Sequence, residues 1–310
     1  MKIAFVFPGQ GSQSVGMMDA WSDNAAVQAA LRAGNEALGE DLVGLIAHGP
    51  AETLNLTTHT QPAMLLCSVA MYRAWQAAGG RAPDLVAGHS LGEYSALVAA
   101  QSLALTDALR IVRVRADAMQ SAVPVGQGGM AAIIGLDDVA VREACIRAEQ
   151  GQAVEAVNFN APGQVVIAGH AEAVARACDL AKAAGAKRAL VLPVSAPFHS
   201  RLLEPAARVL AQALSGISVA SPAIPLINNV DVAQAQDPDA VRDALVRQAW
   251  HPVRWVETIQ AMKKAGVSHI VECGPGKVLS GLIKRIDREI QSFNIMDPTS
   301  LQQTLDALRG

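Results

Sequence analysis

The sequence predicts an α/β protein in which a large domain with a parallel sheet carries a small inserted domain. Short apolar runs typical of buried strands alternate with helical patterns along the chain. Residues 130–194 follow the order strand-helix-strand-strand-helix-strand, which is typical of a ferredoxin-like unit. The 310 residues, 51% of them hydrophobic, suffice for one large domain or two ordinary ones.

The first part of the chain contains the opening strands of the large domain. The elements expected there are, in order, a strand at 3–7, a glycine-rich loop at 8–13, a long helix from Thr60 toward Trp75, a strand at 85–87, a helix at 93–100, and a helix from a cap at Thr106 to about Val123.

Segment 123–129 is rich in glycine and proline and is the best linker candidate. The elements expected after it are strands at 130–135, 153–158, 164–168 and 188–194, helices at 137–149 and 171–185, a turn at 160–163, and large-domain strands at 226–228 and 268–272. We therefore expect a large domain of residues 1–125 and 198–310, a ferredoxin-like domain of residues 126–197, and a substrate site in the cleft between them.

Ser90 is the strongest candidate for a nucleophile. It lies in Gly-His-Ser-Leu-Gly at residues 88–92, between an apolar strand and a helix. In such an elbow the serine projects at the helix N-terminus, where the Leu91 N–H and the helix dipole stabilise an oxyanion. The alternative is a turn of small residues with a structural serine.

Arg115 differs from the other basic residues of its predicted helix. Arg110 and Arg113 have Asp107 and Asp117 as ion-pair partners within about one helical turn, which is typical of a solvated face. The residues three and four positions from Arg115 are all apolar. Its guanidinium therefore extends to solvent, pairs with a carboxylate on another element, or binds a substrate carboxylate.

His199 follows the last strand of the insert, where the chain re-enters the large domain. A lone histidine is usually structural, but Ser90 needs a base that takes its proton and later protonates the leaving group. No acid between residues 90 and 199 clearly ends a large-domain strand. A Ser–His dyad is therefore expected instead of a full triad.

Two further segments are candidates for the site. The loop at 8–13 directly follows the first strand, and its Gln10 backbone can supply a second oxyanion donor. A phosphate-binding loop is the alternative, but no Lys-Ser/Thr follows these glycines, which disfavours Walker chemistry. Gln248 is the least specific candidate from the residues alone.

Composition excludes several classes of protein. The formal charge of −3 argues against a nucleic-acid binder, and no apolar run approaches the ~18 residues that span a bilayer. The apolar run at the N-terminus ends too early for a signal peptide. The cysteines have no metal-site spacing, so we expect no metal and reduced thiols in the cytoplasm. They are Cys67, Cys145, Cys178 and Cys273.

Together these residues resemble the malonyl-CoA:acyl carrier protein transacylase family of bacterial type II fatty acid synthesis. The resemblance covers nearly the whole chain, and its motifs are specific in combination. They are residues 7–13, 60–63, 88–93, 158–160 and 271–276, together with the Arg115 helix and His199, in family order.

The resemblance implies a hydrolase-like large domain, a ferredoxin-like insert and a ping-pong reaction through a malonyl-Ser90 ester. By this resemblance Ser90 carries the acyl group, His199 is the general base and acid, and Arg115 binds the malonyl carboxylate. The backbone N–H groups of Gln10 and Leu91 form the oxyanion hole, and the main-chain carbonyl of Gln248 takes the place of a triad acid. Gln61 and Asn160 line the pocket.

The implied partners are malonyl-CoA and a holo acyl carrier protein, whose phosphopantetheine belongs to the carrier. We expect no resident cofactor, no nucleic acid, no membrane and a monomer. Two basic pairs are candidates for docking the acidic carrier, although ordinary solvated pairs are an equal alternative. They are Lys187 with Arg188 and Lys284 with Arg285.

Three alternatives stay open. The same transfer could supply a polyketide synthase or malonate-decarboxylase carrier protein. A serine esterase or thioesterase would share the elbow but would not need Arg115. A non-catalytic docking subunit is disfavoured because Ser90, Arg115 and His199 are all present.

Overall fold

A four-stranded parallel sheet lies at the centre of the large domain in the computed structural model, which describes residues 1–194 and 196–309. The strand order is β2(Leu85–Gly88), β1(Lys2–Phe7), β7(Val267–Cys273) and β8(Gln291–Ile295). All of β1 except Lys2 is buried. Its apolar run is nearly continuous because helices cover both faces of a parallel sheet.

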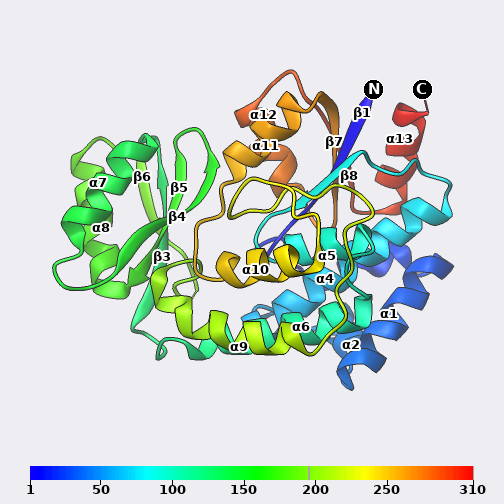
Figure 1. The fold of residues 1–310 in the computed structure, drawn as a ribbon, viewed down its shortest axis with the longest axis horizontal. Coiled ribbons are helices and arrows are strands. Elements are labelled where there is room, and N and C mark those ends of the chain that lie inside the picture. Colours follow the sequence, from blue (N-terminus) through cyan, green and yellow to red (C-terminus); the bar gives the residue numbers. More distant parts are fainter. Residues whose placement is uncertain (195, 310) are drawn as a thin grey trace.

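The side chains of β1 enter two different cores. Phe5 and Phe7 pack into the cluster that contains the α4 side chains, whereas Ala4 and Val6 pack into a cluster with Trp255. The sheet therefore separates two helical layers (Figure 1). The large-domain helices are α1(Ala25–Leu38), α2(Leu42–His48), α3(Ala51–Leu54), α4(Thr57–Ala77), α5(Gly92–Ala99), α6(Leu105–Ser121), α9(Glu204–Ser215), α10(Pro238–Gln248), α11(Trp255–Lys264), α12(Val278–Ile286) and α13(Pro298–Leu308), with 3₁₀ turns η1(Asp19–Trp21) and η2(Arg201–Leu203).

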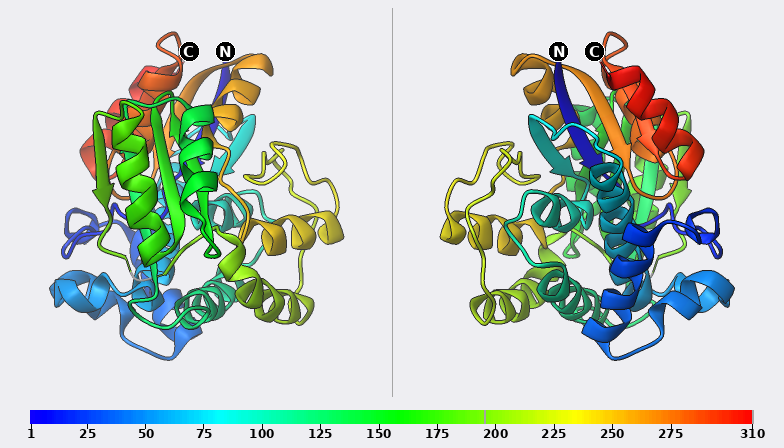
Figure 2. Two further views of the ribbon diagram at one scale, coloured as in Figure 1. Left: turned by 90° about the vertical axis from the view of Figure 1, so that its left-hand side faces the viewer. Right: turned by 90° about the vertical axis from the view of Figure 1, so that its right-hand side faces the viewer.

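The second sheet is antiparallel. Its strand order is β4(Val154–Ala161), β5(Gln164–His170), β3(Gly128–Ile134) and β6(Arg188–Val191). The helices α7(Asp138–Ala148) and α8(Ala171–Ala183) cover its outer face, as the left view of Figure 2 shows. This strand-helix-strand-strand-helix-strand order is the one predicted for the insert. The predicted domain boundaries stay a prediction, and the elements of this sheet lie inside residues 126–197.

The edge strand β4 is seated on the large domain. The Val253 N–H donates to the Val157 carbonyl at 2.8 Å, and the Phe159 N–H donates to the Val253 carbonyl at 3.0 Å. The Arg285 side chain of α12 donates to the Pro162 carbonyl at 3.4 Å. Backbone pairing therefore sets where the small sheet lies relative to the parallel sheet.

Two helix starts differ from prediction. Helix α4 begins at Thr57, earlier than expected, and Pro62 lies inside it. Helix α6 begins at Leu105, so Thr106 lies inside the helix and the cap expected there is wrong. Threonine is favoured as a cap only by local hydrogen bonding, which the packing of a buried helix overrides.

Strand boundaries differ at both ends of the insert. Strand β3 begins at Gly128, which shortens the predicted linker, and β6 ends at Val191 instead of residue 194. Strand β4 runs to Ala161, so Asn160 lies in a strand and not in the predicted turn. The turn is tighter because Gly163 adopts a φ of 69°, a left-handed conformation that glycine accepts without strain.

The large-domain strands were predicted incompletely. Residues 226–228 contribute only isolated bridges, of Leu226 with Val86 and of Ile227 with Gln234. Strand β8 has the sequence Gln-Ser-Phe-Asn-Ile, which lacks a continuous apolar run, so periodicity did not indicate it. It lies at the edge of the sheet, where polar residues are tolerated. Within the described part of the chain, no helix combines the length and apolarity needed to cross a bilayer.

Candidate active site

Ser90 lies at the apex of a strained turn between β2 and α5. Its φ of 53° is uncommon for a residue with a side chain and persists only where the surroundings enforce it. A Cβ built on Gly88 would lie 1.8 Å from the carbonyl carbon of Gly92, and one built on Gly92 would lie 2.0 Å from the Phe7 carbonyl oxygen. The two glycines therefore permit the close strand–helix packing of a nucleophile elbow.

The imidazole of His199 faces the Ser90 hydroxyl. The distance from Ser90 Oγ to His199 Nε2 is 2.6 Å, and His199 Nδ1 lies 2.8 Å from the Gln248 carbonyl oxygen. A carbonyl only accepts, so the ring proton lies on Nδ1 and leaves Nε2 to accept the hydroxyl proton. The structure therefore joins Ser90, His199 and the Gln248 main chain in a Ser–His arrangement without a carboxylate.

Burial determines the charge state of His199. The residue is 3% exposed. Desolvation, followed by the positive charge of Arg115, lowers its pKa from 6.5 to about 3. The imidazole is consequently neutral near pH 7, which is the form that accepts a proton.

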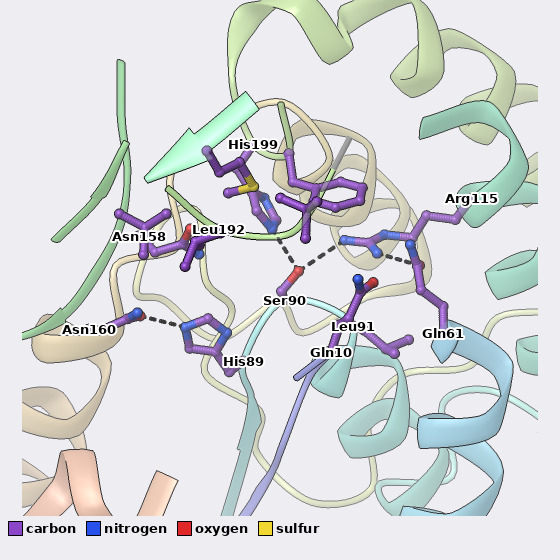
Figure 3. Close-up of a pocket in the computed structure, with 14 residues that line it drawn as sticks. Gln10, Gln61, His89, Ser90, Leu91, Arg115, Asn158, Asn160, Leu192 and His199 are labelled. Atoms are coloured by element: carbon purple, nitrogen blue, oxygen red, sulfur yellow. Dashed lines mark hydrogen bonds between the residues drawn. The ribbon is translucent and has the colours of Figure 1, made fainter. Parts of the chain in front are cut away.

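Arg115 lies beside this pair with a fully buried guanidinium. It is 2% exposed and donates to Gln61 Oε1 at 2.6 Å and to Gln248 Oε1 at 2.9 Å. Its Nη2 also lies 3.3 Å from Ser90 Oγ (Figure 3). Burial lowers the pKa of Arg115, although a guanidinium stays charged in proteins.

Neutral amides, and no carboxylate, hold the Arg115 charge. None of the ion pairs formed by the described residues includes Arg115. Its predicted helical neighbours behave differently: Arg110 pairs with Asp107, whereas Arg113 pairs with Glu40 instead of the expected Asp117. The two structural alternatives for Arg115, extension to solvent and pairing with a distant carboxylate, are therefore wrong.

The loop that carries Gln10 lies against the elbow. Backbone contact is direct because the His89 N–H donates to the Phe7 carbonyl at 3.0 Å. Gln10 and Leu91 both line the same cavity as Ser90. The Gln10 side chain is held by Thr57, whose hydroxyl donates to Gln10 Oε1 at 2.8 Å.

Asn160 reaches the elbow from the small domain. Its Oδ1 lies 2.7 Å from His89 Nε2, and burial lowers the His89 pKa so that this ring is neutral and donates. The Asn160 oxygen is thus already engaged by protein. Gln61 is engaged in the same way, since its Oε1 accepts from Arg115 and its Nε2 donates to the Thr57 hydroxyl at 3.1 Å.

Asn229 holds the elbow in place and was not predicted from the sequence. The Ser90 N–H donates to Asn229 Oδ1 at 2.8 Å, and Asn229 Nδ2 donates to the Gly88 carbonyl at 2.7 Å. This fully buried side chain therefore clamps both sides of the elbow. It follows residues 226–228 in an irregular segment, where neither periodicity nor motif spacing singles it out.

The predicted site residues other than Gln248 line one cavity of about 220 Å³ between the two sheets. Apart from His89 and Asn158, its other walls are apolar side chains of the small domain and of the segment before His199. The cavity-lining residues are Gln10, Gln61, His89, Ser90, Leu91, Arg115, Met130, Asn158, Asn160, Val166, Leu192, Val194, Phe198 and His199.

The four basic residues considered for carrier docking lie outside this lining. All four are exposed. The Lys187 side chain lies over Gly135, whose N–H donates to the Gly163 carbonyl, and Arg285 donates to the Pro162 carbonyl. One member of each pair therefore lies beside the β4–β5 turn. Among the described residues, no group of three or more His, Cys, Asp or Glu side chains is arranged to hold a metal ion.

Comparison with known proteins gives consistent matches over nearly the full length. The family model of the acyl transferase domain matches residues 4–297. The malonyl CoA-acyl carrier protein transacylase of Escherichia coli K12 is 53% identical over 98% of this chain and 99% of its own length.

Solved structures agree with this match. The acyl-carrier-protein S-malonyltransferase of Burkholderia pseudomallei is 60% identical, with a TM-score of 0.97 over 99% of this chain and 100% of its own. A malonyl-transacylase structure in complex with a type II polyketide synthase acyl-carrier protein is 50% identical, with a TM-score of 0.98 over 99% of this chain and 100% of the matched chain.

Proposed function

The chain belongs to the acyl transferase domain family, and from this premise we propose that it transfers malonyl groups to acyl carrier protein for fatty acid synthesis. The donor is malonyl-CoA and the acceptor is the phosphopantetheine thiol of the carrier. One observation supports this most directly: Ser90 Oγ lies 2.6 Å from His199 Nε2 and 3.3 Å from the Arg115 guanidinium. A nucleophile, its base and a buried cation thus share one cavity.

In the first half-reaction, His199 Nε2 takes the Ser90 proton while Oγ attacks the thioester carbonyl carbon. The carbon–sulfur bond then breaks, and coenzyme A leaves with the proton from Nε2. The Gln248 carbonyl accepts from the Nδ1–H throughout and stabilises the transient imidazolium. A malonyl-Ser90 ester remains.

In the second half-reaction, the carrier thiol gives its proton to Nε2 and attacks the ester carbonyl carbon. The carbon–oxygen bond to Ser90 breaks, and Oγ takes the proton back from His199. The backbone N–H groups of Gln10 and Leu91 stabilise the oxyanion in both halves, since both residues line the cavity at the N-terminus of α5.

Arg115 selects the acyl group. A malonyl carboxylate at the cavity pairs with its planar fork, whereas an acetyl group leaves the buried charge without an anion. Gln61 and Asn160 shape the pocket around the acyl chain. The enzyme uses no cofactor of its own, because coenzyme A arrives as the substrate thioester and phosphopantetheine arrives on the carrier.

The carrier docks on the basic surface around the β4–β5 turn, formed by Lys187, Arg188, Lys284 and Arg285. Opposite charge would steer an acidic carrier to this surface even though the whole chain carries −3. We place the enzyme in the cytoplasm as a monomer.

Intact-protein mass spectrometry after mixing with malonyl-CoA or acetyl-CoA tests the function. We expect a malonyl adduct on the wild type, little with acetyl-CoA, and none on Ser90→Ala. The adduct should disappear when holo acyl carrier protein is added. Release of free malonate without transfer would instead identify a hydrolase, and no reaction at all would identify a docking subunit.

A second candidate acceptor is the carrier protein of a polyketide synthase. This candidate is supported by the solved complex of a malonyl-transacylase with such a carrier, because that transacylase is 50% identical to this chain. Parallel transfer assays with a fatty acid carrier and a polyketide carrier at equal concentration distinguish the two. The physiological acceptor is the one with the higher kcat/KM.

A further inference from the structure

Glu93 is a buried carboxylate that the reaction scheme does not use. It lies in the first turn of α5 and is 1% exposed. Its Oε2 accepts from the Asn229 N–H at 2.9 Å and from Gln248 Nε2 at 3.2 Å. The ion pairs of the described residues do not include Glu93, and burying a carboxylate without a direct cation is costly.

The amide of Gln248 stands between Glu93 and Arg115. Its Nε2 donates to Glu93 and to the Ser90 carbonyl, and its Oε1 accepts from Arg115. The amide can satisfy all of these partners in one orientation only, because its nitrogen donates and its oxygen accepts. Gln248 is fully buried, so the arrangement is also shielded from water.

We propose that Glu93 is a positioning residue that serves, through the Gln248 amide, as the resident counter-charge of Arg115. It thereby sets how strongly the enzyme prefers acyl groups with a carboxylate. This inference rests on the proposed malonyl transfer. A carboxylate in direct contact with Arg115 would take the place of the substrate carboxylate, whereas one held behind an amide balances the charge and leaves Arg115 hydrogen-bonded only to neutral groups.

Charge balance makes the consequence measurable. Without substrate, Arg115 and an ionised Glu93 cancel, and a bound malonyl carboxylate adds one uncompensated negative charge. When Glu93 is neutral, the incoming carboxylate completes the pair instead. Malonyl binding is therefore tighter, relative to acetyl binding, when Glu93 carries no charge.

The neutral pH range is where this difference matters. Burial raises the pKa of Glu93 from 4.5 to about 7, opposed by the Asn229 N–H, Gln248 and Arg115. The other charged group that acts on it is Asp231, which raises the pKa further. Glu93 is therefore protonated below about pH 7 and ionised above it.

Glu93→Gln tests the charge alone. One carbonyl oxygen can occupy the position of Oε2 and keep both hydrogen bonds. At pH 8 we expect the kcat/KM ratio of malonyl-CoA to acetyl-CoA to rise about three- to tenfold over the wild type. The wild-type ratio should fall as pH rises through about 7, and the variant ratio should stay flat. His199 acts on both substrates, so its titration cancels in the ratio.

Two further variants separate charge from structure. Glu93→Ala also removes the support of Gln248, so kcat should fall about tenfold or more with both acyl-CoAs while Glu93→Gln retains it. Glu272→Gln is the matched control. Glu272 is another fully buried carboxylate, but it accepts from Leu279 and Ser280 of α12. Its variant should leave the ratio unchanged.

A Glu93→Gln ratio that equals the wild-type value at every pH would overturn this proposal alone. So would an equal rise in Glu272→Gln. If Glu93→Gln does not fold, the wild-type pH series decides, since a ratio independent of pH contradicts the role of the charge. A wild type that takes up no malonyl group would overturn the proposed function together with this inference.

Discussion

At the scale of single residues, the site depends on buried polar groups that hydrogen-bond to one another. Ser90, His199, Arg115 and Gln248 each complete the hydrogen bonding of another member, with distances between 2.6 and 3.3 Å. In a medium of low dielectric constant such a network is rigid when satisfied and costly when broken. Substitutions within it should therefore have effects that are not additive.

Arg115→Ala should abolish most malonyl transfer while raising acetyl transfer relative to malonyl. The substitution removes a buried hydrogen-bonded charge, for which a loss of about 2–4 kcal/mol in malonyl kcat/KM is expected. Acyl loading by malonyl-CoA and acetyl-CoA, followed by mass spectrometry, measures it. An unchanged acyl preference would contradict the carboxylate fork.

His199 should make the protein sensitive to acid. Its pKa is about 3 when folded and 6.5 when unfolded, so the unfolded chain binds the proton first as pH falls. The contribution to the free energy of unfolding is complete above pH 6.5 and is lost progressively toward pH 3. Urea unfolding of the wild type and His199→Asn across this range checks the sign.

The variant should lose less stability with acid than the wild type. Subtracting the two curves removes the other titrating groups, including Glu93, whose raised pKa has the opposite effect. Parallel curves would mean that the His199 imidazole is not buried in its neutral form.

At the scale of elements, the elbow is formed by the packing of β1, β2 and α5 against one another. The strands meet in register, with Phe7 opposite Gly88, and α5 starts where its Gly92 touches the Phe7 carbonyl. A short apolar strand followed by glycine, serine and glycine was enough to predict this unit, because only small residues fit it. Elements without such local constraints, β8 and the start of α6, were predicted poorly.

Gly92→Ala should displace Ser90 and stop acyl loading. Its Cβ would lie 2.0 Å from the Phe7 carbonyl oxygen, a backbone atom that moves only if the strand or the helix moves. A loss of about 1–3 kcal/mol in stability is expected from this overpacking. Thermal unfolding and malonyl loading measure the two effects.

Gly281→Ala is the control for this substitution. Gly281 lies inside α12, and a Cβ there meets no atom within 4 Å. Alanine favours the helix by up to about 1 kcal/mol over glycine, so stability should be kept or raised. Full loading by a Gly92→Ala enzyme would show that the elbow tolerates a methyl group.

At the scale of the whole molecule, the cavity exists because the small sheet is seated on the large domain. Asn160 of β4 reaches His89 beside the nucleophile, and Val253 pairs with β4. The βαββαβ order predicted the small sheet itself. This order does not predict how the small sheet is oriented on the large domain, because long-range contacts determine how one domain lies on another.

Charge reversal on the surface around the β4–β5 turn should weaken carrier docking. In a variant with Lys187, Arg188, Lys284 and Arg285 changed to Glu, KM for the carrier should rise about tenfold or more at low salt. Malonyl loading from malonyl-CoA should stay near the wild-type rate, since none of the four residues lines the cavity. Carrier kinetics unaffected at low salt would dismiss this surface.

By itself, the sequence determined the α/β class, the elbow with Ser90, and the apolar residues one helical turn before and after Arg115. These follow from local rules: strand and helix periodicity, the need for small residues at a strained turn, and the cost of burying a charge. The family resemblance added the remaining candidate roles, position by position.

Only the tertiary structure decided which groups complete the site. Asn229 and Glu93 contact the elbow and Gln248 across separations of 139 and 155 residues, respectively. The amides that hold Arg115 likewise come from α4 and α10, far from α6 in sequence. Such contacts depend on how whole elements pack, because burial leaves each polar group only the partners that packing brings to it.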